Sequence, residues 1–193
     1  MLSARCLSHH LISFSLLLSC TGCLLASCFS YCAEMDLQSF SIRARVSEDT
    51  MLGKDAPEDF EAYDVSLNFD LPWKNYSMSG WGIGTNLMAS SGILRGAGKN
   101  ALVVSLTPEL ILGTEDRRFI VDLGAGGALF SRHRFGTQDY GGPFQFVLTV
   151  GVAVPLYKKL RLGYRFLHYS DAGVNGSDTI GADFHMIMFI YRF

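Results

Sequence analysis

Hydrophobic and polar side chains alternate one by one in several segments that follow residue 36. In residues 63–71 every odd position is apolar or aromatic, and every even position carries Asp, Ser or Asn. Because successive side chains of a β-strand point to opposite faces, this pattern predicts strands with one apolar face. The chain has eight such segments, at about residues 40–46, 63–71, 81–89, 102–112, 119–129 and 144–154, with two more within 160–193.

The connections between these segments alternate in length. Long polar connections cover residues 47–60, 91–99, 131–142 and 171–179, and short ones cover residues 72–78, 113–117 and 155–158. This rhythm is typical of bacterial outer-membrane barrels, whose outer loops are long and whose periplasmic turns are short. The polar faces carry Gly, Ser, Thr, Asn and single charges, which suit the narrow interior of an eight-stranded barrel. We therefore predict an all-β fold, an eight-stranded antiparallel transmembrane β-barrel, with a soluble β-sandwich as the alternative.

Residues 1–33 have the pattern of a secretory signal peptide. Arg5 and two histidines precede an apolar run over residues 11–25, which is shorter than the roughly 20 residues that a spanning helix needs. We predict a signal peptide over residues 1–33 and the barrel over residues 34–193. A transmembrane anchor is one alternative. Lipoprotein cleavage, which would leave Cys28 lipidated, is another, and with either cleavage the protein leaves the cytoplasm.

The composition excludes several classes of site. All five cysteines lie within residues 6–32, so the barrel region holds no disulfide framework and no thiolate metal site. The net charge is −2, which gives no reason to expect nucleic acid as a partner. The carboxylates of residues 48–61 resemble a solvated loop rather than a calcium site. We predict neither a metal nor a cofactor.

The segment 160–170 places a base and a hydroxyl on its apolar face. Leu, Leu, Tyr and Phe occupy the even positions from 160 to 166, and His168 and Ser170 continue this face. If the leader is removed in the periplasm, the odd-numbered strands run outward, so this pair lies at the outer rim and faces lipid. Asp183 shares the face of Phe189 on the last strand and is predicted to lie beside the pair.

These three residues have the chemical types of a nucleophile, a base and an orienting carboxylate. Ser170 becomes a nucleophile when His168 accepts its proton. Asp183 would fix the imidazole tautomer and stabilise its charged form. The candidate donors to a developing oxyanion are the backbone amides of Asp171, Ala172 and Gly173.

Other interpretations of these polar residues stay open at this point. Groups at a barrel rim also occur simply to meet lipid headgroups, and Asp178 competes with Asp183 for the carboxylate role. His185 faces outward and is interpreted as an aromatic-belt residue. The loop cations, which either bind phosphate or are merely solvated, are Arg95, Lys99, Arg132, His133 and Arg134.

Three short motifs make the hypothesis more specific. GYRFLHYSDAG at 163–173, GAD at 181–183 and IYRF at 190–193 resemble the lipid A 3-O-deacylase family of outer-membrane enzymes. The segment 135–154 is similar to the sixth strand of that family. The resemblance implies an eight-stranded barrel with serine-esterase chemistry that needs no calcium. By position, the family's nucleophile, base and acidic residue correspond to Ser170, His168 and Asp183.

The resemblance also implies a substrate and a location. It implies removal of an ester-linked acyl chain from lipid A, the lipopolysaccharide anchor, in the outer leaflet of a Gram-negative outer membrane. Asp171 stands where the family usually has asparagine, and Asp183 stands where its best-known members have glutamate. A non-catalytic small barrel for adhesion or envelope integrity is the alternative function, and an acyltransferase is a third. The acyl position that is cut and the formation of a homodimer are left open.

Overall fold

The computed structural model describes residues 35–47, 49–52, 59–174 and 181–193. The predicted signal peptide, its alternatives at residues 1–33 and the candidate Asp178 lie outside the described residues, so these remain predictions. Within the described ranges, no helix has the length and apolar character needed to cross a membrane.

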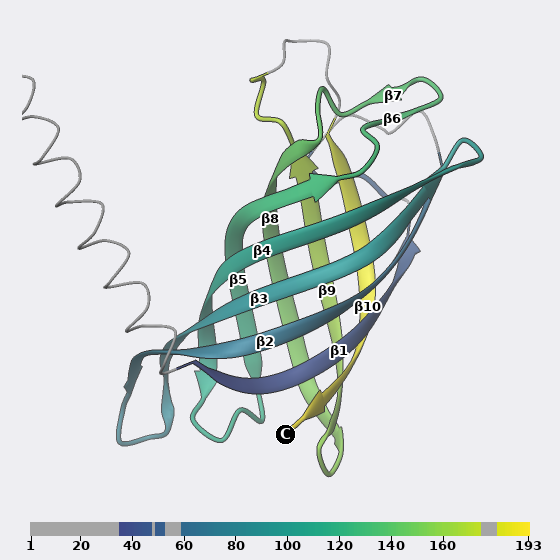
Figure 1. Cartoon of the computed structure of the whole chain (residues 1–193). Helices are drawn as coiled ribbons and strands as arrows, with labels where there is room; N and C mark the ends of the chain where they lie inside the picture. Colours follow the sequence, from purple (N-terminus) through teal and green to yellow (C-terminus); the bar gives the residue numbers. More distant parts are fainter. Residues whose placement is uncertain (1–34, 48, 53–58, 175–180) are drawn as a thin grey trace, which may run out of the picture. The chain divides into compact units, whose positions relative to one another are not determined.

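Eight antiparallel strands close into a barrel (Figure 1), as the alternating pattern predicts. The strands are β1 (Asp36–Ser47), β2 (Phe60–Tyr76), β3 (Trp81–Gly96), β4 (Lys99–Thr114), β5 (Ile120–Phe130), β8 (Phe144–Tyr157), β9 (Leu160–Ser170) and β10 (Ala182–Arg192). Their order around the barrel is β1-β10-β9-β8-β5-β4-β3-β2. The short strands β6 (Arg134–Phe135) and β7 (Gln138–Asp139) form a separate two-stranded sheet in the connection between β5 and β8.

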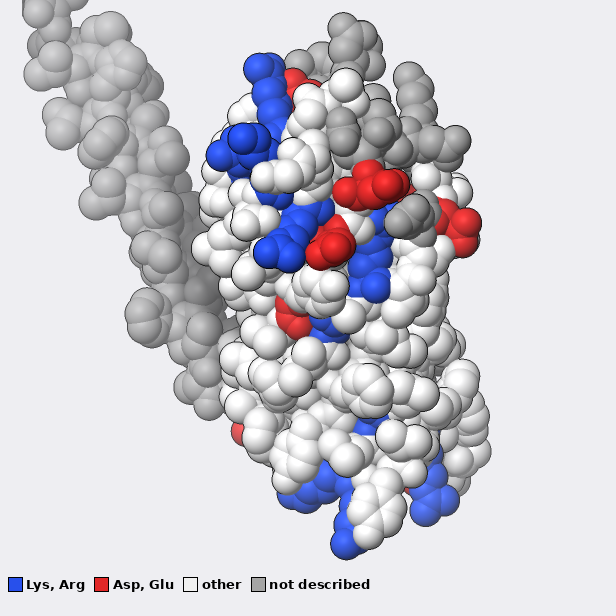
Figure 2. Space-filling model, turned by 90° about the vertical axis from the view of Figure 1, so that its right-hand side faces the viewer, with Lys and Arg blue, Asp and Glu red and all other residues white. Residues whose placement is uncertain are grey.

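The two ends of the barrel differ in their connections. We call the end with connections 48–59, 97–98, 131–143 and 171–181 the loop end, and the end with connections 77–80, 115–119 and 158–159 the turn end. The C-terminus lies at the turn end (Figure 1). On the face that Figure 2 shows, Lys and Arg gather at the turn end and charges of both signs gather toward the loop end. A largely uncharged surface separates them.

One predicted loop is wrong. Residues 91–99 continue β3 and β4, which are joined by a tight turn at Ala97 and Gly98 with φ of 47° and 69°. Two successive positive φ values are the requirement of a type I′ hairpin turn. These strands extend beyond the apolar band that faces lipid, so their ends need no apolar face. Their polar residues therefore gave the pattern of a loop.

The barrel interior is polar but tightly paired. The Arg165 guanidinium lies 2.5 Å from Glu109 Oε1 and 2.8 Å from Asp122 Oδ1, and all three side chains are buried. Arg43 pairs with Asp64 in the same interior. Each of these charges therefore has a partner of opposite sign, which a buried ion requires.

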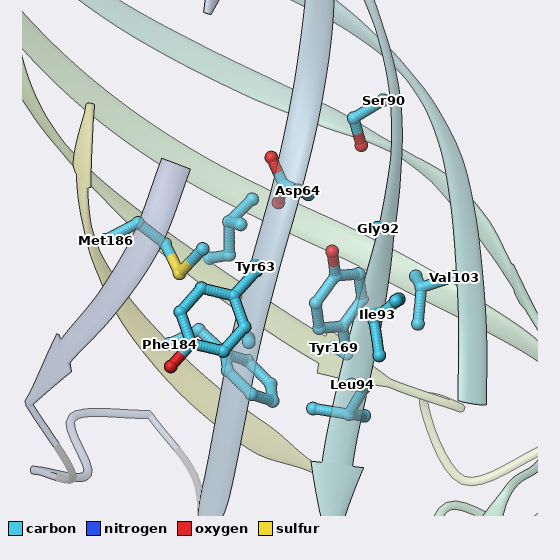
Figure 3. A pocket seen from close by; sticks show the side chains of 12 residues that line it. Tyr63, Asp64, Ser90, Gly92, Ile93, Leu94, Val103, Tyr169, Phe184 and Met186 are labelled. Atoms are coloured by element: carbon cyan, nitrogen blue, oxygen red, sulfur yellow. The ribbon is translucent and has the colours of Figure 1, made fainter. Parts of the chain in front are cut away.

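Aromatic side chains fill the interior at the loop end. The buried rings that contact one another there are Phe60, Phe130, Phe135, Tyr140, Tyr169 and Phe184. A cavity of about 20 Å³ remains beside Tyr169, Phe184 and Met186 (Figure 3), and this volume holds about one water molecule. The interior at the loop end is thus a packed core.

Replacement of Arg165 by methionine is expected to destabilise the barrel strongly. It leaves the carboxylates of Glu109 and Asp122 buried without their cation, which costs about 3–5 kcal/mol. Urea unfolding of the purified barrel in lipid vesicles measures the loss. The matched control is Arg118→Met, because the Arg118 side chain is 82% exposed, and we expect its unfolding midpoint to stay at that of the wild type. Equal midpoints for the two variants would contradict the ion-pair account.

Candidate active site

His168 and Ser170 lie at the loop end of β9 and point out of the barrel. The side chains of Arg165, Leu167 and Tyr169, which occupy the intervening positions, are buried in the interior. His168 is paired with Leu148 of β8 on one side and with Asp183 of β10 on the other. The structure therefore places the two residues on the outer face that the alternation predicts.

Asp183 and His168 are joined by a short hydrogen bond. Nδ1 of His168 lies 2.6 Å from Oδ1 of Asp183. An ionised carboxylate can only accept, so Nδ1 of the imidazole donates and its Nε2 keeps the lone pair. Nε2 is consequently the atom available to accept a proton from a hydroxyl.

The second oxygen of Asp183 is held by the backbone of a distant segment. Oδ2 accepts hydrogen bonds from the amides of Met51 at 2.5 Å and Leu52 at 2.7 Å, both from the connection between β1 and β2. The Asp183 side chain is only 1% exposed as a result. The sequence predicts the outward direction of Asp183 correctly but misses this cover, because a backbone amide leaves no signal in the residue types.

The hydroxyl of Ser170 is engaged by the turn that follows it. Oγ accepts a hydrogen bond of 2.9 Å from the amide of Ala172. Ala172 and Gly173 have φ of 53° and 78°, so the chain turns in the left-handed region directly after this hydrogen bond. Within the described residues no hydrogen bond joins Ser170 to His168, so the hydroxyl must rotate toward Nε2 before it can lose its proton.

Two of the three predicted oxyanion donors, the amides of Ala172 and Gly173, have different partners in this turn. The amide of Ala172 faces the oxygen of Ser170, next to which an oxyanion would form. The amide of Gly173 instead donates to the carboxylate of Asp171 at 2.9 Å. The geometry of this turn therefore favours the Ala172 amide as the donor.

Gly181 brings the last strand close to the base and the hydroxyl. A Cβ at this position would lie 3.1 Å from Cε1 of His168 and 3.3 Å from Cβ of Ser170. The same atom would lie 2.7 Å from the carbonyl oxygen of Tyr169, which is closer than side-chain atoms come to backbone. Glycine at position 181 therefore lets β10 pack against the site.

His185 contacts the rings of Tyr164 and Phe166, and its place in an aromatic belt stays a prediction. It points outward but is only 7% exposed, and both ring nitrogens have partners. Nδ1 lies 2.5 Å from the hydroxyl of Tyr164, and Nε2 lies 3.0 Å from the carbonyl oxygen of Asp49.

The loop cations divide into paired and exposed groups. Arg134 contacts Asp139 at 2.7 Å, and His133 lies 3.4 Å from the same carboxylate. Partial burial raises the pKa of Asp139, but the Gly141 amide, His133 and Arg134 outweigh it and hold that pKa below its usual range. Asp139 therefore stays ionised and offsets the charge of Arg134.

The other three predicted cations are Arg132, Arg95 and Lys99. Arg132 is exposed in the connection between β5 and β8, and the other two lie on the hairpin between β3 and β4. Arg95 lies 3.6 Å from Glu61, and both side chains are more than half exposed. Lys99 is also exposed. Among the described residues, no cluster of His, Cys, Asp and Glu has an arrangement that could hold a metal ion.

Comparison with known proteins shows the family to which the chain belongs. Residues 61–192 match the lipid A 3-O-deacylase (PagL) family. The chain belongs to that family. The matched range contains His168, Ser170 and Asp183, whereas the two amides that bind Asp183 lie before it.

Individual members of the PagL family agree with this assignment. The lipid A deacylase PagL of Bordetella bronchiseptica is 29% identical over 136 residues, which cover 67% of this chain and 75% of the relative. The crystal structure of the outer membrane enzyme PagL superposes with a TM-score of 0.65 at 19% identity, covering 79% of this chain and 98% of that one. The fold is therefore that of PagL, and the barrel belongs to the outer membrane.

Proposed function

We propose that this PagL-family chain hydrolyses an ester-linked acyl chain of lipid A, with Ser170, His168 and Asp183 as its catalytic residues. The observation that carries the assignment of residues is the hydrogen bond between His168 and Asp183 on the lipid-facing side of the barrel. It leaves a basic nitrogen beside a serine at the level where the ester of a membrane lipid would lie.

The reaction has two steps. In the first, Oγ of Ser170 attacks the ester carbonyl carbon while Nε2 of His168 takes the hydroxyl proton. The Ala172 amide donates to the oxyanion as it forms. The tetrahedral intermediate then expels the sugar oxygen, which takes the proton from His168, and an acyl-serine remains.

In the second step His168 removes a proton from water, and the hydroxide attacks the acyl-serine carbonyl. The bond to Oγ breaks, Ser170 recovers its proton from His168, and the fatty acid leaves. Throughout, Asp183 holds the Nδ1–H and stabilises the imidazolium that forms in each step.

The register of the barrel supplies a path for the acyl chain. Starting from Ser170, the paired residues on successive strands are Phe146, Gly127, Leu106, Ala89 and Leu67. The row continues through β1 and β10 and returns to β9 at Leu160, ten residues (170 − 160) nearer the turn end. The row of paired residues that begins at Ser170 therefore runs obliquely around the outer surface of the barrel, from the rim toward the turn end.

This row crosses an apolar hollow on the lipid-facing surface. The hollow has a volume of about 830 Å³, and its floor includes Ala89, Ser91 and Gly127. Phe144 and Phe146 form the wall nearest Ser170, with Phe146 directly paired to it. We propose that the acyl chain whose ester is cut lies in this hollow, because small residues leave the space that it needs.

Expression of the protein in a Gram-negative host tests the function. Mass spectra of its lipid A are expected to lose the mass of one acyl chain, together with release of the free fatty acid. Unchanged acylation would favour the non-catalytic barrel, and a gain in acyl mass would favour an acyltransferase. The non-catalytic alternative also predicts that deletion of residues 47–60 or 131–142 impairs adhesion or envelope integrity, whereas substitution of Ser170 has no effect on either. A homodimer of the barrel remains a prediction.

A further inference from the structure

A short segment from the connection between β1 and β2 crosses the outside of β10. We call this segment, Asp49–Leu52, the strap. Its carbonyl at Asp49 accepts from His185, and its amides at Met51 and Leu52 donate to Asp183. The strap therefore contacts two successive outward-facing side chains of the strand that carries the catalytic carboxylate.

The end of β1 explains how the strap reaches this position. The pairing of β1 with β10 shifts at a bulge between Arg45 and Ser47, and its last pair joins Ser47 to His185. Asp183 lies beyond that pair, so β10 continues past the end of β1. A bulge bends the strand and disrupts the ladder. The strap then crosses over the part of β10 that does not pair with β1.

Local contacts fix the strap at its start. The hydroxyl of Ser47 accepts from the amide of Asp49 at 3.1 Å and lies 2.6 Å from its carboxylate. Nε of Arg45 donates to the carbonyl of Ser47 at 2.9 Å. These bonds tie Asp49, the first residue of the strap, to the end of β1.

His185 ties the strap to the barrel wall in one defined tautomer. The carbonyl of Asp49 can only accept, so Nε2 of His185 donates to it. Nδ1 of the neutral ring then carries the lone pair and accepts from the hydroxyl of Tyr164. A chain of hydrogen bonds thus runs from Tyr164 through His185 to the strap.

The side chains of the strap face away from the carboxylate. Met51 is 67% exposed and Leu52 is 56% exposed, although both backbone amides are bonded to Asp183. An apolar side chain suits a segment that lies on the outside of a membrane barrel, and the amides suit a buried carboxylate that needs donors. One segment therefore meets lipid with one face and the catalytic carboxylate with the other.

We propose that the strap and His185 are positioning elements for catalysis, which hold Asp183 against His168. This inference rests on the proposed function. Without the two amides, Oδ2 of Asp183 would lose its donors and the carboxyl group could turn away from Nδ1. The base would then lose its fixed tautomer, so the effect falls on the chemical step and leaves substrate binding largely intact.

Proline at position 52 tests the strap directly, because proline has no amide hydrogen to donate. The reference is Leu52→Ala, which removes most of the same side chain and keeps the amide. We expect kcat of Leu52→Pro to lie about tenfold or more below that of Leu52→Ala, since a hydrogen bond to a charged group is lost. The two KM values are expected to agree within about twofold. Equal kcat values in the two variants would overturn the proposal.

A second pair of variants, at His185, tests the proposal if Leu52→Pro does not fold. His185→Gln retains a donor for the Asp49 carbonyl, whereas His185→Ala has none. We expect kcat to fall in His185→Ala and to recover in His185→Gln, at similar KM. Equal loss in both variants would show that His185 acts only through packing and would overturn its positioning role.

One readout does not depend on activity and separates the two proposals. The Nδ1 proton of His168, seen by NMR in nanodiscs, is expected to stay protected from exchange in Leu52→Ala and to exchange faster in Leu52→Pro. Wild-type protein that releases no acyl chain would refute the proposed function, and with it the catalytic role of the strap, even if exchange shows that the strap holds the imidazole. Unchanged exchange in Leu52→Pro would refute the strap alone.

Discussion

Replacement of Ser170 by alanine is expected to abolish acyl release while the barrel still folds and inserts. The methyl group cannot attack a carbonyl, and losses of about 10⁴-fold or more follow removal of a catalytic serine. Ser170 faces out of the barrel, and in the described structure its hydroxyl has one hydrogen bond, which it accepts from the amide of Ala172. Its loss therefore leaves the packed interior untouched.

Mass spectrometry of lipid A, combined with the heat-dependent gel mobility of the barrel, measures both parts of this expectation. The matched control is Ser79→Ala, which removes a hydroxyl at the turn end, where Ser79 contacts Ser77. Acyl release by Ser170→Ala at the rate of this control would show that another residue is the nucleophile.

Asp183→Asn is expected to slow the reaction by about 10⁴-fold, and the strap explains why. The amides of Met51 and Leu52 will hold the oxygen of the new carboxamide, so its NH₂ group must face His168. An NH₂ group donates to Nδ1 and thereby moves the imidazole proton to Nε2. The base then presents a proton where it needs a lone pair, a defect of the size known for this tautomer change in serine proteases.

Comparison with Asp183→Ala distinguishes this account from simple loss of charge. Alanine leaves Nδ1 free, and the imidazole can adopt either tautomer, so Asp183→Asn is expected to be at least as slow as Asp183→Ala. Nitrogen chemical shifts of His168 report the tautomer directly. An Asp183→Asn enzyme within tenfold of the wild type would contradict a catalytic role for this carboxylate.

The sequence predicts the strands and their faces because both follow from a period of two. The alternation of β9 places His168 and Ser170 outside, and the antiparallel register with β10 brings Asp183 beside His168. The alternation fixes only the face of Asp183, and its place opposite His168 depends on the register, which the structure supplies. Residues 91–99 were assigned to a loop from their polar content. That assignment fails because polar residues occur both in turns and in strands that extend into water.

The parts of the site that depend on backbone groups could not be predicted in this way. The strap acts through amides, which every residue except proline carries, and its position depends on the bulge before Ser47. Its two apolar side chains gave no reason to link it to Asp183. In the turn after Ser170, only the hydrogen bonds of the structure show that the Ala172 amide faces the hydroxyl and that the Gly173 amide faces Asp171.

The aromatic rings that fill the loop end have a consequence for the cell envelope. In the part of the chain that the structure describes, Phe60, Phe135, Tyr140 and their neighbours fill the barrel at this end and leave no open channel for ions or antibiotics. Overproduction of the protein is therefore not expected to increase the diffusion of solutes across the outer membrane through the barrel itself. Any increase in drug uptake would have to arise from the altered packing of lipopolysaccharide itself.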